Sequence, residues 1–188
     1  MKRRIFIAIN LPEKIKNRLK EYREQHGELP VRWTKTPSLH LTLVFIGYVD
    51  NEQMLEACKI THKIAEETSP FFIDFKRIVL GPLGKEPRMI WLEGQTKEEL
   101  TQLKNRLEKA LLAGNIGLQK LETRAFSPHL TLARIKMEAW REAQINAGSV
   151  ETAFPVQLNV NSIEVMESDL KFDGAEYATL EGCPLSGN

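Results

Sequence analysis

Two of the histidines in this chain open the same tetrapeptide. His40-Leu41-Thr42-Leu43 recurs as His129-Leu130-Thr131-Leu132, and the 188 residues contain only four histidines in all. For average composition, Leu-Thr-Leu after a given histidine should occur about once in a thousand cases or less. Chance therefore explains the repetition poorly, and the sequence predicts a shared function for the two copies.

The spacing of each copy suits catalysis by paired side chains. On a β-strand alternate residues share a face, so each histidine projects beside its threonine, roughly 6–7 Å away, while both leucines point into a core. One imidazole can act as a base when neutral and another as an acid when protonated. With the hydroxyls of Thr42 and Thr131 holding phosphoryl oxygens, His40 and His129 suit displacement at phosphorus. The alternative is a pair of core histidines beside threonines that favour strands.

The remaining histidines and the motif content point away from other chemistries. His26 is expected at a helix end, where the dipole favours a cation, and His62 is expected to be packed or half-exposed on a helix stripe with Cys58. The sequence contains no HxH, HExxH or CxxC spacing for zinc, no GxGxxG and no Walker loop. We therefore expect no metal and no cofactor.

The charge is unevenly distributed along the chain. The formal net charge is +1, but residues 1–36 hold ten Lys or Arg against four Glu, a net +6 that the remaining residues offset with −5. A locally basic face suits a partner that carries phosphate. The alternative is a helix with a solvated charged face, which needs no such partner.

The residue pattern predicts alternating strands and helices within one domain, residues 1–188. Some strand pairs are joined by loops too short for a helical crossover, which favours an α+β fold with largely antiparallel sheets. A bulge is expected at Asn161-Ser162 and a turn at Asp173-Gly174. Strands are expected over residues 4–11, 39–46, 71–80, 88–93, 129–135, 156–166 and 175–180. Helices are expected from Pro12 to His26-Gly27, over 50–67, from a capping box of Thr96 and Glu99 to Gly114 and Gly117, and over 137–146.

The composition is that of an ordinary globular protein, with 42% apolar and 27% charged residues. No apolar run approaches the ~18 residues of a membrane span, and the start lacks the features of a secretory signal. We expect a cytoplasmic protein that does not bind membranes.

The paired tetrapeptides and their surroundings resemble the 2H phosphoesterase superfamily. The similarity is greatest to its RNA 2′,3′-cyclic phosphodiesterase branch, also called the 2′-5′ RNA ligase family. It extends over the whole chain, through the segments Arg4-Ile5-Phe6-Ile7-Ala8-Ile9, Leu39-His40-Leu41-Thr42-Leu43-Val44-Phe45-Ile46-Gly47, Phe126-Ser127-Pro128-His129-Leu130-Thr131-Leu132-Ala133-Arg134 and the closing Tyr177, Leu180 and Cys183-Pro184-Leu185.

The resemblance implies a bilobal fold of two mostly antiparallel sheets, related by a pseudo-two-fold axis around a central cleft. It implies metal-free opening of a 2′,3′-cyclic phosphate at an RNA end to a 2′-phosphate, and a detectable reverse reaction that joins ends through a 2′-5′ linkage. His40 then protonates the departing O3′ and His129 activates water, although the sequence itself is symmetric on this division. Thr42 and Thr131 become phosphate ligands, and we expect a monomer.

Arg134 also matches a family position that is expected to contact phosphate. Strict alternation places it on the opposite face of the strand from His129 and Thr131. A bulge, a strand end or the length of the side chain must therefore redirect it. The sequence predicts phosphate binding by Arg134 only under that condition.

Other functions share parts of this pattern. A related enzyme acting on another cyclic phosphate, such as ADP-ribose 1″,2″-cyclic phosphate, or on a 3′-5′-linked oligonucleotide would use the same residues. A non-catalytic module that binds RNA ends would keep the fold, although the intact histidines and threonines argue against it. A metal-dependent hydrolase would lose activity in a chelator.

Overall fold

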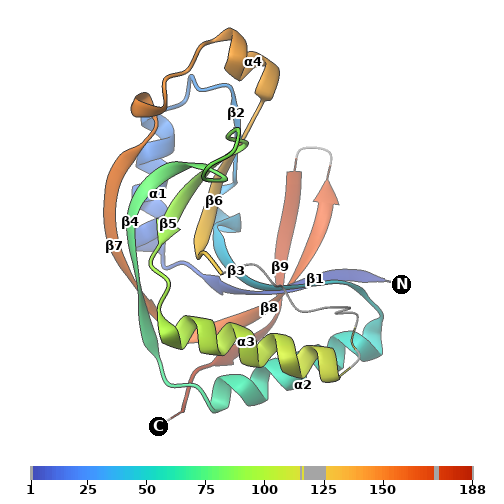
Figure 1. Ribbon diagram of the computed structural model, residues 1–188. Coiled ribbons are helices and arrows are strands. Elements are labelled where there is room, and N and C mark those ends of the chain that lie inside the picture. The colour runs from blue at the N-terminus through green and yellow to red at the C-terminus, as the bar shows by residue number, and fades with distance from the viewer. Residues whose placement is uncertain (1, 115, 117–125, 172–173, 188) are drawn as a thin grey trace.

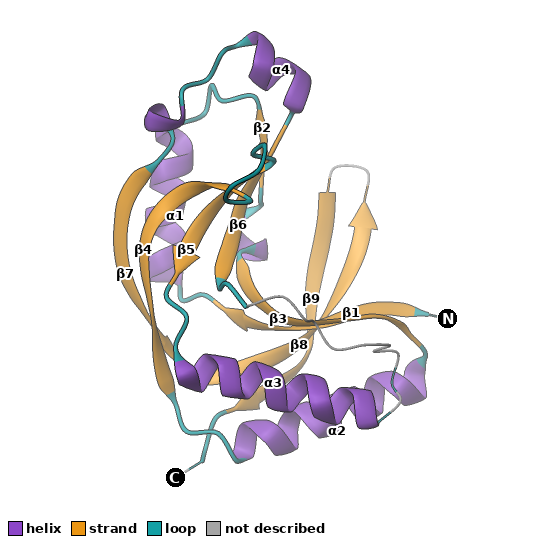
Figure 2. Ribbon diagram, in the orientation of Figure 1, coloured by secondary structure: helices purple, strands orange, loops and turns teal. Residues whose placement is uncertain are grey.

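The computed structural model describes residues 2–114, 116, 126–171 and 174–187. Its strands form two antiparallel sheets, and helices pack against them (Figures 1 and 2). The expected α+β class with antiparallel sheets is therefore confirmed.

Each sheet carries one copy of the repeated tetrapeptide, at the start of β3 in the first sheet and at the start of β6 in the second. The first sheet has the order β3-β1-β8-β9, with β1 (Arg3–Asn10), β3 (His40–Val49), β8 (Ser162–Lys171) and β9 (Gly174–Pro184). The second has the order β2-β6-β5-β4-β7, with β2 (Val31–Trp33), β4 (Phe71–Gly81), β5 (Met89–Gly94), β6 (His129–Ile135) and β7 (Thr152–Val160).

The helices link the two sheets. They are α1 (Glu13–Gln25), α2 (Asn51–Glu66), α3 (Glu98–Ala113) and α4 (Met137–Glu142), with short 3₁₀ turns η1 (Thr36–Ser38) and η2 (Ala147–Ser149). Although α3 follows a strand of the second sheet, it lies beside α2 and contacts β3 of the first (Figure 1). Conversely, α1 follows β1 of the first sheet but donates through Arg18 to the carbonyl of Pro155 in β7. Each sheet thus depends on a helix that follows the other.

Strand β1 shows how alternation builds the two faces of the first sheet. Ile5, Ile7 and Ile9 point into the main core, and all are nearly inaccessible. Phe6 and Ala8 point the other way and form a small separate cluster with Met166 and Tyr177. This second face is the one that His40 contacts.

The helices follow the spacing of their apolar residues. In α1 the buried residues are Ile15, Leu19 and Tyr22, and in α3 a stripe of leucines is buried. A capping box does occur, but at Asp50 and Gln53 of α2. No helix in the described part of the chain is both long and apolar enough to span a membrane.

The capping box expected at Thr96 and Glu99 is wrong. Helix α3 begins at Glu98 after Lys97, which makes no side-chain cap. The hydroxyl of Thr96 instead donates to the carbonyl of Phe126 at 3.3 Å. The Thr96 hydroxyl, which the pattern assigned to the helix cap, therefore makes a tertiary contact instead.

Three further expectations need correction. The strand expected over 156–166 is two strands, because the chain leaves the second sheet after β7 and enters the first at β8 rather than forming a bulge at Asn161. No strand is expected between residues 11 and 39, but β2 forms at Val31–Trp33. The helix expected over 137–146 ends at Glu142, shortly before Gln144 with its φ of 49°. Gly117 and Asp173 lie outside the described residues.

Candidate active site

His40 is held by its backbone neighbour and by two aromatic rings. The carbonyl of Ser38 accepts a hydrogen bond from Nδ1 of His40 at 2.8 Å. A carbonyl can only accept, so Nδ1 carries the proton and Nε2 of the neutral ring is left with its lone pair. The rings of Phe6 and Tyr177 lie 4.9 and 4.8 Å from the imidazole, centroid to centroid. These contacts fix which nitrogen is available for proton transfer.

His129 repeats the arrangement in the second sheet. Its Nδ1 donates to the carbonyl of Ser127 at 2.8 Å, again two residues upstream. Its ring stacks on Trp91 of the adjacent strand β5, with centroids 4.0 Å apart. In both histidines Nε2 is therefore the nitrogen available for proton transfer.

The surroundings favour the neutral form of both rings. Burial lowers the pKa of His40 and of His129 below the ordinary value, and the hydrogen bond to the backbone carbonyl offsets part of this effect. A neutral imidazole is a ready base. For one of these rings to act as an acid, it would have to gain its proton with the help of a nearby negative charge.

The two threonines lie on the faces that the alternation predicts. Thr42 is opposite Ala8 of β1, and Thr131 is opposite Trp91 of β5. Both threonines are partly buried between fully buried leucines. Because Trp91 stacks on His129, the pairing places Thr131 on the histidine face of the sheet.

Arg134 reaches this face because β6 contains an irregularity. The pairing shifts by one residue, so that Trp91 is opposite Thr131 while Ile90 is opposite Ala133, and Leu132 and Ala133 are both buried. Arg134 then falls opposite Met89, which alternation places on the same face of β5 as Trp91. The exposed side chain therefore shares a face with His129 and Thr131, which meets the condition set by the sequence.

Strand β3 has the same shift but a different residue at the corresponding place. Ala8 is opposite Thr42 while Ile7 is opposite Val44, so the exposed Phe45 occupies the position that Arg134 has in β6. The guanidinium of Arg4 lies over the Phe45 ring, 4.8 Å from its centroid. The two copies thus agree in backbone and differ in the side chain that follows the motif.

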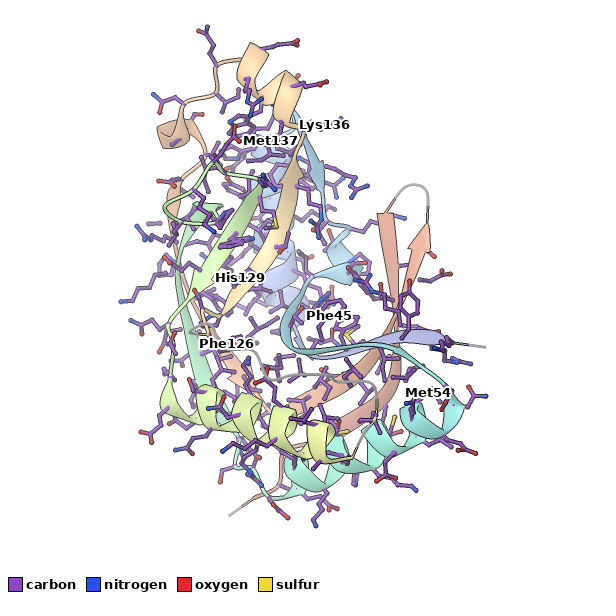
Figure 3. The ribbon with its side chains drawn as sticks, turned by 45° about the vertical axis from the view of Figure 1, so that its right-hand side comes forward. Phe45, Met54, Phe126, His129, Lys136 and Met137 are labelled. Atoms are coloured by element: carbon purple, nitrogen blue, oxygen red, sulfur yellow. The ribbon has the colours of Figure 1, made fainter. Side chains whose placement is uncertain are left out.

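A short connection ties the two motifs together. The hydroxyl of Thr34 donates to the carbonyl of Thr131 at 2.8 Å, and the chain then passes through η1 to His40. The six residue-to-residue steps from Thr34 to His40 reach about 22 Å at most, and the 3₁₀ turn shortens this further. Strands β3 and β6 also contact each other directly. Figure 3 shows β6 running from His129 toward Lys136, with Phe45 of β3 on the side of His129.

Sequence reasoning missed the residues that orient the histidines. Ser38 and Ser127 act through backbone carbonyls, for which their side chains give no signal. Trp91 was identifiable, since alternation from Met89 places it on one face of a strand, but only the strand order reveals that this strand is beside His129.

The other two histidines have structural partners, and His62 is half-exposed rather than packed, with 48% of its side chain accessible. Both ring nitrogens of His26 contact backbone carbonyls, those of Tyr22 and Ser149, and His62 pairs with Glu66 at 3.3 Å. In the described part of the chain, no group of three or more His, Cys, Asp or Glu is placed to hold a metal ion.

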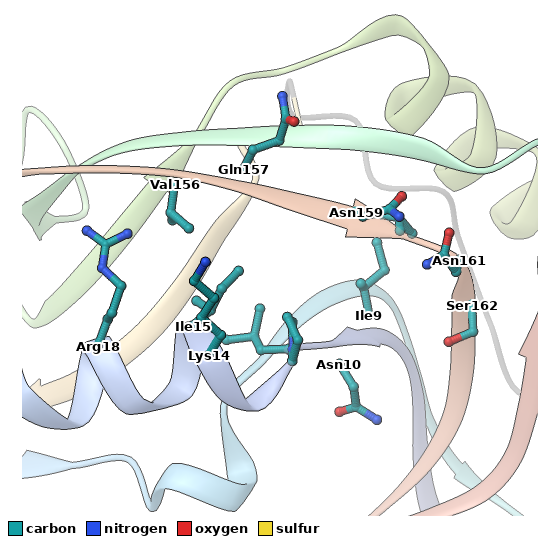
Figure 4. A pocket seen from close by; sticks show the side chains of 13 residues that line it. Ile9, Asn10, Lys14, Ile15, Arg18, Val156, Gln157, Asn159, Asn161 and Ser162 are labelled. Carbon is teal, nitrogen blue, oxygen red and sulfur yellow. The ribbon is translucent and has the colours of Figure 1, made fainter.

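A groove of about 690 Å³ lies elsewhere, between the start of α1 and strands β7 and β8 (Figure 4). Lys14, Arg18 and several amide side chains line it, but none of the histidines, threonines or Arg134 does. The guanidinium of Arg18 is occupied, because it lies over the Phe154 ring and donates to a backbone carbonyl. The groove is therefore separate from the two motifs.

Solved structures share this fold. A protein of Thermus thermophilus superposes with a TM-score of 0.81 at 26% identity, covering 98% of both chains. Escherichia coli LigT in its apo form gives a TM-score of 0.76 at 25% identity, again covering 98% of both chains. LigT has also been solved in complex with 3′-AMP. The expected 2H phosphoesterase-like fold is thus confirmed.

Proteins related in sequence support the same family. RNA 2′,3′-cyclic phosphodiesterase of Methanocaldococcus jannaschii is 31% identical, over 71% of this chain and 72% of the relative. The protein of the same name from Aquifex aeolicus is 30% identical, over 83% of this chain and 82% of the relative. The family model described as the 2′-5′ RNA ligase superfamily matches residues 11–171. The chain carries one anchored histidine on each of two matching strands. It belongs to the 2′-5′ RNA ligase superfamily.

Proposed function

We propose that this protein is an RNA 2′,3′-cyclic phosphodiesterase that uses His40 and His129 as its acid–base pair. One observation carries the proposal: both histidines donate from Nδ1 to a carbonyl two residues upstream, at 2.8 Å in each case. This common anchoring leaves two Nε2 atoms, one from each sheet, for proton transfer. The name shared by the sequence relatives supplies the substrate class.

The proposed reaction moves two protons and breaks one bond. His129 takes a proton from water through Nε2, and the water oxygen attacks the phosphorus of the cyclic phosphate. The P–O3′ bond breaks, and His40 gives the proton on its Nε2 to the departing O3′. The products are a 2′-phosphate and a free 3′-hydroxyl, and in the ligation direction the two histidines exchange roles.

The substrate itself helps to set the protonation states. Both imidazoles favour the neutral form in the free protein, because burial lowers the pKa of each. An anionic cyclic phosphate bound next to them raises the pKa of the nearer ring and so favours the protonated acid. The phosphate thus promotes the protonation that its own cleavage requires.

Hydroxyl donors suit the charge that develops on the phosphoryl oxygens. Thr42 and Thr131 each lie two residues beyond a histidine on the same face, and we assign them to the non-bridging oxygens. Arg134, brought to that face by the shift in β6, is a planar donor for a phosphate group of the substrate. Neither a metal nor a cofactor has a role in this scheme.

Both motifs come from one chain, which supports action as a monomer. We further propose that the protein works in the cytoplasm on RNA with a 2′,3′-cyclic phosphate end. Elution as a monomer from a sizing column during turnover would agree with the first statement, and a dimer required for turnover would contradict it.

The decisive experiment is incubation in EDTA with a short RNA that ends in a 2′,3′-cyclic phosphate. Conversion to the 2′-phosphate, abolished in His40→Ala and in His129→Ala, is the expected result. Binding of the RNA without conversion would indicate an RNA-end-binding module instead. Conversion only of another cyclic phosphate, such as ADP-ribose 1″,2″-cyclic phosphate, would redirect the substrate, and loss of activity in EDTA would indicate a metal-dependent hydrolase.

A further inference from the structure

Two arginines face the same side of the second sheet at adjacent positions. In the antiparallel pair of β2 and β6, Arg32 is directly opposite Arg134. Residues directly opposite each other project from the same face of a sheet. Both side chains are exposed, whereas Val31 and Ile135 beside them are buried. Arg32 therefore joins Arg134 on the face that carries His129 and Thr131.

Among the described residues, these two arginines lack the acidic partners that some other arginines have, and so do Arg4, Arg18, Arg23 and Arg88. Within residues 2–114, 116, 126–171 and 174–187, neither Arg32 nor Arg134 forms an ion pair. Elsewhere in the same residues, guanidinium–carboxylate pairs join Arg3 to Glu167, Arg77 to Glu93, Arg106 to Glu67 and Arg141 to Glu86. Like charges directly opposite on a sheet are destabilising. An anion that both guanidiniums can bind would offset this repulsion.

The position of the pair separates it from the reacting phosphate. Arg134 lies three residues beyond Thr131 on β6, less than about 10 Å along the strand. With the cyclic phosphate at the threonines, the next phosphate of an RNA strand is the phosphodiester that joins the terminal nucleotide to the one before it. Guanidinium groups bind phosphate oxygens through two parallel hydrogen bonds, so two of them can hold one phosphodiester firmly.

We propose that Arg32 and Arg134 together bind the backbone phosphate immediately upstream of the cyclic phosphate. The proposal rests on the proposed function, because it takes RNA as the substrate. It explains how a site for one phosphate distinguishes an RNA end from a free cyclic nucleotide. It also gives the strand a direction, since the RNA leaves the histidines along β6 toward β2.

Binding measured without turnover gives the first test. The probe is a five-nucleotide RNA with a fluorescent 5′ label and a terminal 2′-phosphate, followed by anisotropy over a range of salt concentrations. Arg32→Gln should weaken binding at least ~10-fold. It should also make the salt dependence shallower, by about 0.7 in logarithmic slope, because one cation no longer neutralises a phosphate. The control, Arg3→Gln, removes the same charge from an arginine that is paired with Glu167. It should have a much smaller effect on both quantities.

Turnover gives the second test, through a comparison of two substrates. Loss of kcat/KM in Arg32→Gln should be at least ~10-fold greater for a five-nucleotide cyclic phosphate RNA than for a cyclic mononucleotide, which has no upstream phosphate. Arg32→Lys, which keeps the charge without the planar fork, should fall between wild type and Arg32→Gln. Thermal unfolding at low salt should show no loss of stability in Arg32→Gln, because the substitution removes a repulsion.

The outcomes separate this inference from the proposed function. If the wild-type protein converts both substrates and Arg32→Gln has no more effect than Arg3→Gln, the proposed phosphate binding by the two arginines is wrong and the proposed activity stands. Equal losses on both substrates would also overturn the pair. If the wild-type protein converts neither substrate but binds the RNA through Arg32, the proposed activity is wrong and the proposed phosphate binding by the two arginines stands.

Discussion

The indole of Trp91 lies nearly parallel to the imidazole of His129, with 28° between the planes and 4.0 Å between the centroids. His40 has no such neighbour among the described residues, since the rings of Phe6 and Tyr177 are inclined to it by 37° and 80°. An indole face attracts a cation more strongly than other aromatic faces. The two motifs are alike in sequence, but under the proposed division of roles the imidazolium formed on His129 would gain additional stabilisation.

Replacing Trp91 should therefore affect the chemical step. Trp91→Leu removes the aromatic face and is expected to lower kcat more than it raises KM, because the imidazolium forms only during reaction. Trp91→Phe keeps a stacking ring and should retain most of the activity. It also removes an indole N–H that is buried without a hydrogen-bond partner in the described structure. Equal activity in the Leu and Phe variants would show that only volume matters.

The position of Trp91 depends on a glycine in β4. A Cβ added at Gly81 would lie 2.4 Å from Cδ2 of the Trp91 ring, far inside contact distance. Gly81→Ala should displace the indole, reduce turnover and lower stability by about 1–3 kcal/mol, as overpacking does. The matched control is Gly182→Ala in β9, where a Cβ meets nothing within 4 Å. Thermal unfolding and single-turnover rates measure both effects, and similar behaviour of the two variants would contradict the contact.

Loss of either histidine should slow the reaction at least ~100-fold, the usual scale for general acid–base catalysis. His62→Ala provides the control, because this partly exposed histidine pairs with Glu66 on helix α2, outside both motifs. Rates are best measured at saturating substrate, so that weaker binding is not mistaken for slower chemistry. A variant with alanine at both His40 and His129 that kept wild-type turnover would exclude the mechanism.

The pH dependence follows from the lowered pKa values of His40 and His129. Above about pH 6.5 both rings are mainly neutral in the free protein. The histidine that acts as the base is then in its active form, but the histidine that acts as the acid is mostly unprotonated. The kcat/KM profile should be bell-shaped, with its alkaline limb beginning at or below that pH. Bound phosphate raises the pKa of the acid, so the same limb in kcat should lie at higher pH. An optimum of kcat/KM above about pH 7.5 would contradict this account.

The sequence predicted where the candidate site residues lie on their strands better than it predicted the residues that support them. Alternation within one strand was enough to place His40 beside Thr42 and His129 beside Thr131. It could not place Arg134, because the shift opposite Ile90 and Trp91 depends on the neighbouring strand.

The same limit explains the errors in the fold. Strand β2 is only three residues long and owes its form to pairing with β6. The break at Asn161 marks a change of sheet, which local pattern does not record. Where an element is defined by its own apolar spacing, as in α1 and α3, the prediction was confirmed.

Because both halves of the chain contribute strands to both sheets, neither half is expected to fold alone. The residues up to the end of β4 supply β1 and β3 to the first sheet and β2 and β4 to the second, and the rest of the chain completes both. A backbone cut between β4 and β5 would leave two fragments, each with one histidine motif and neither with a whole sheet. Such fragments should stay unfolded apart and recover structure and turnover together on mixing, as an obligate heterodimer made from one protein.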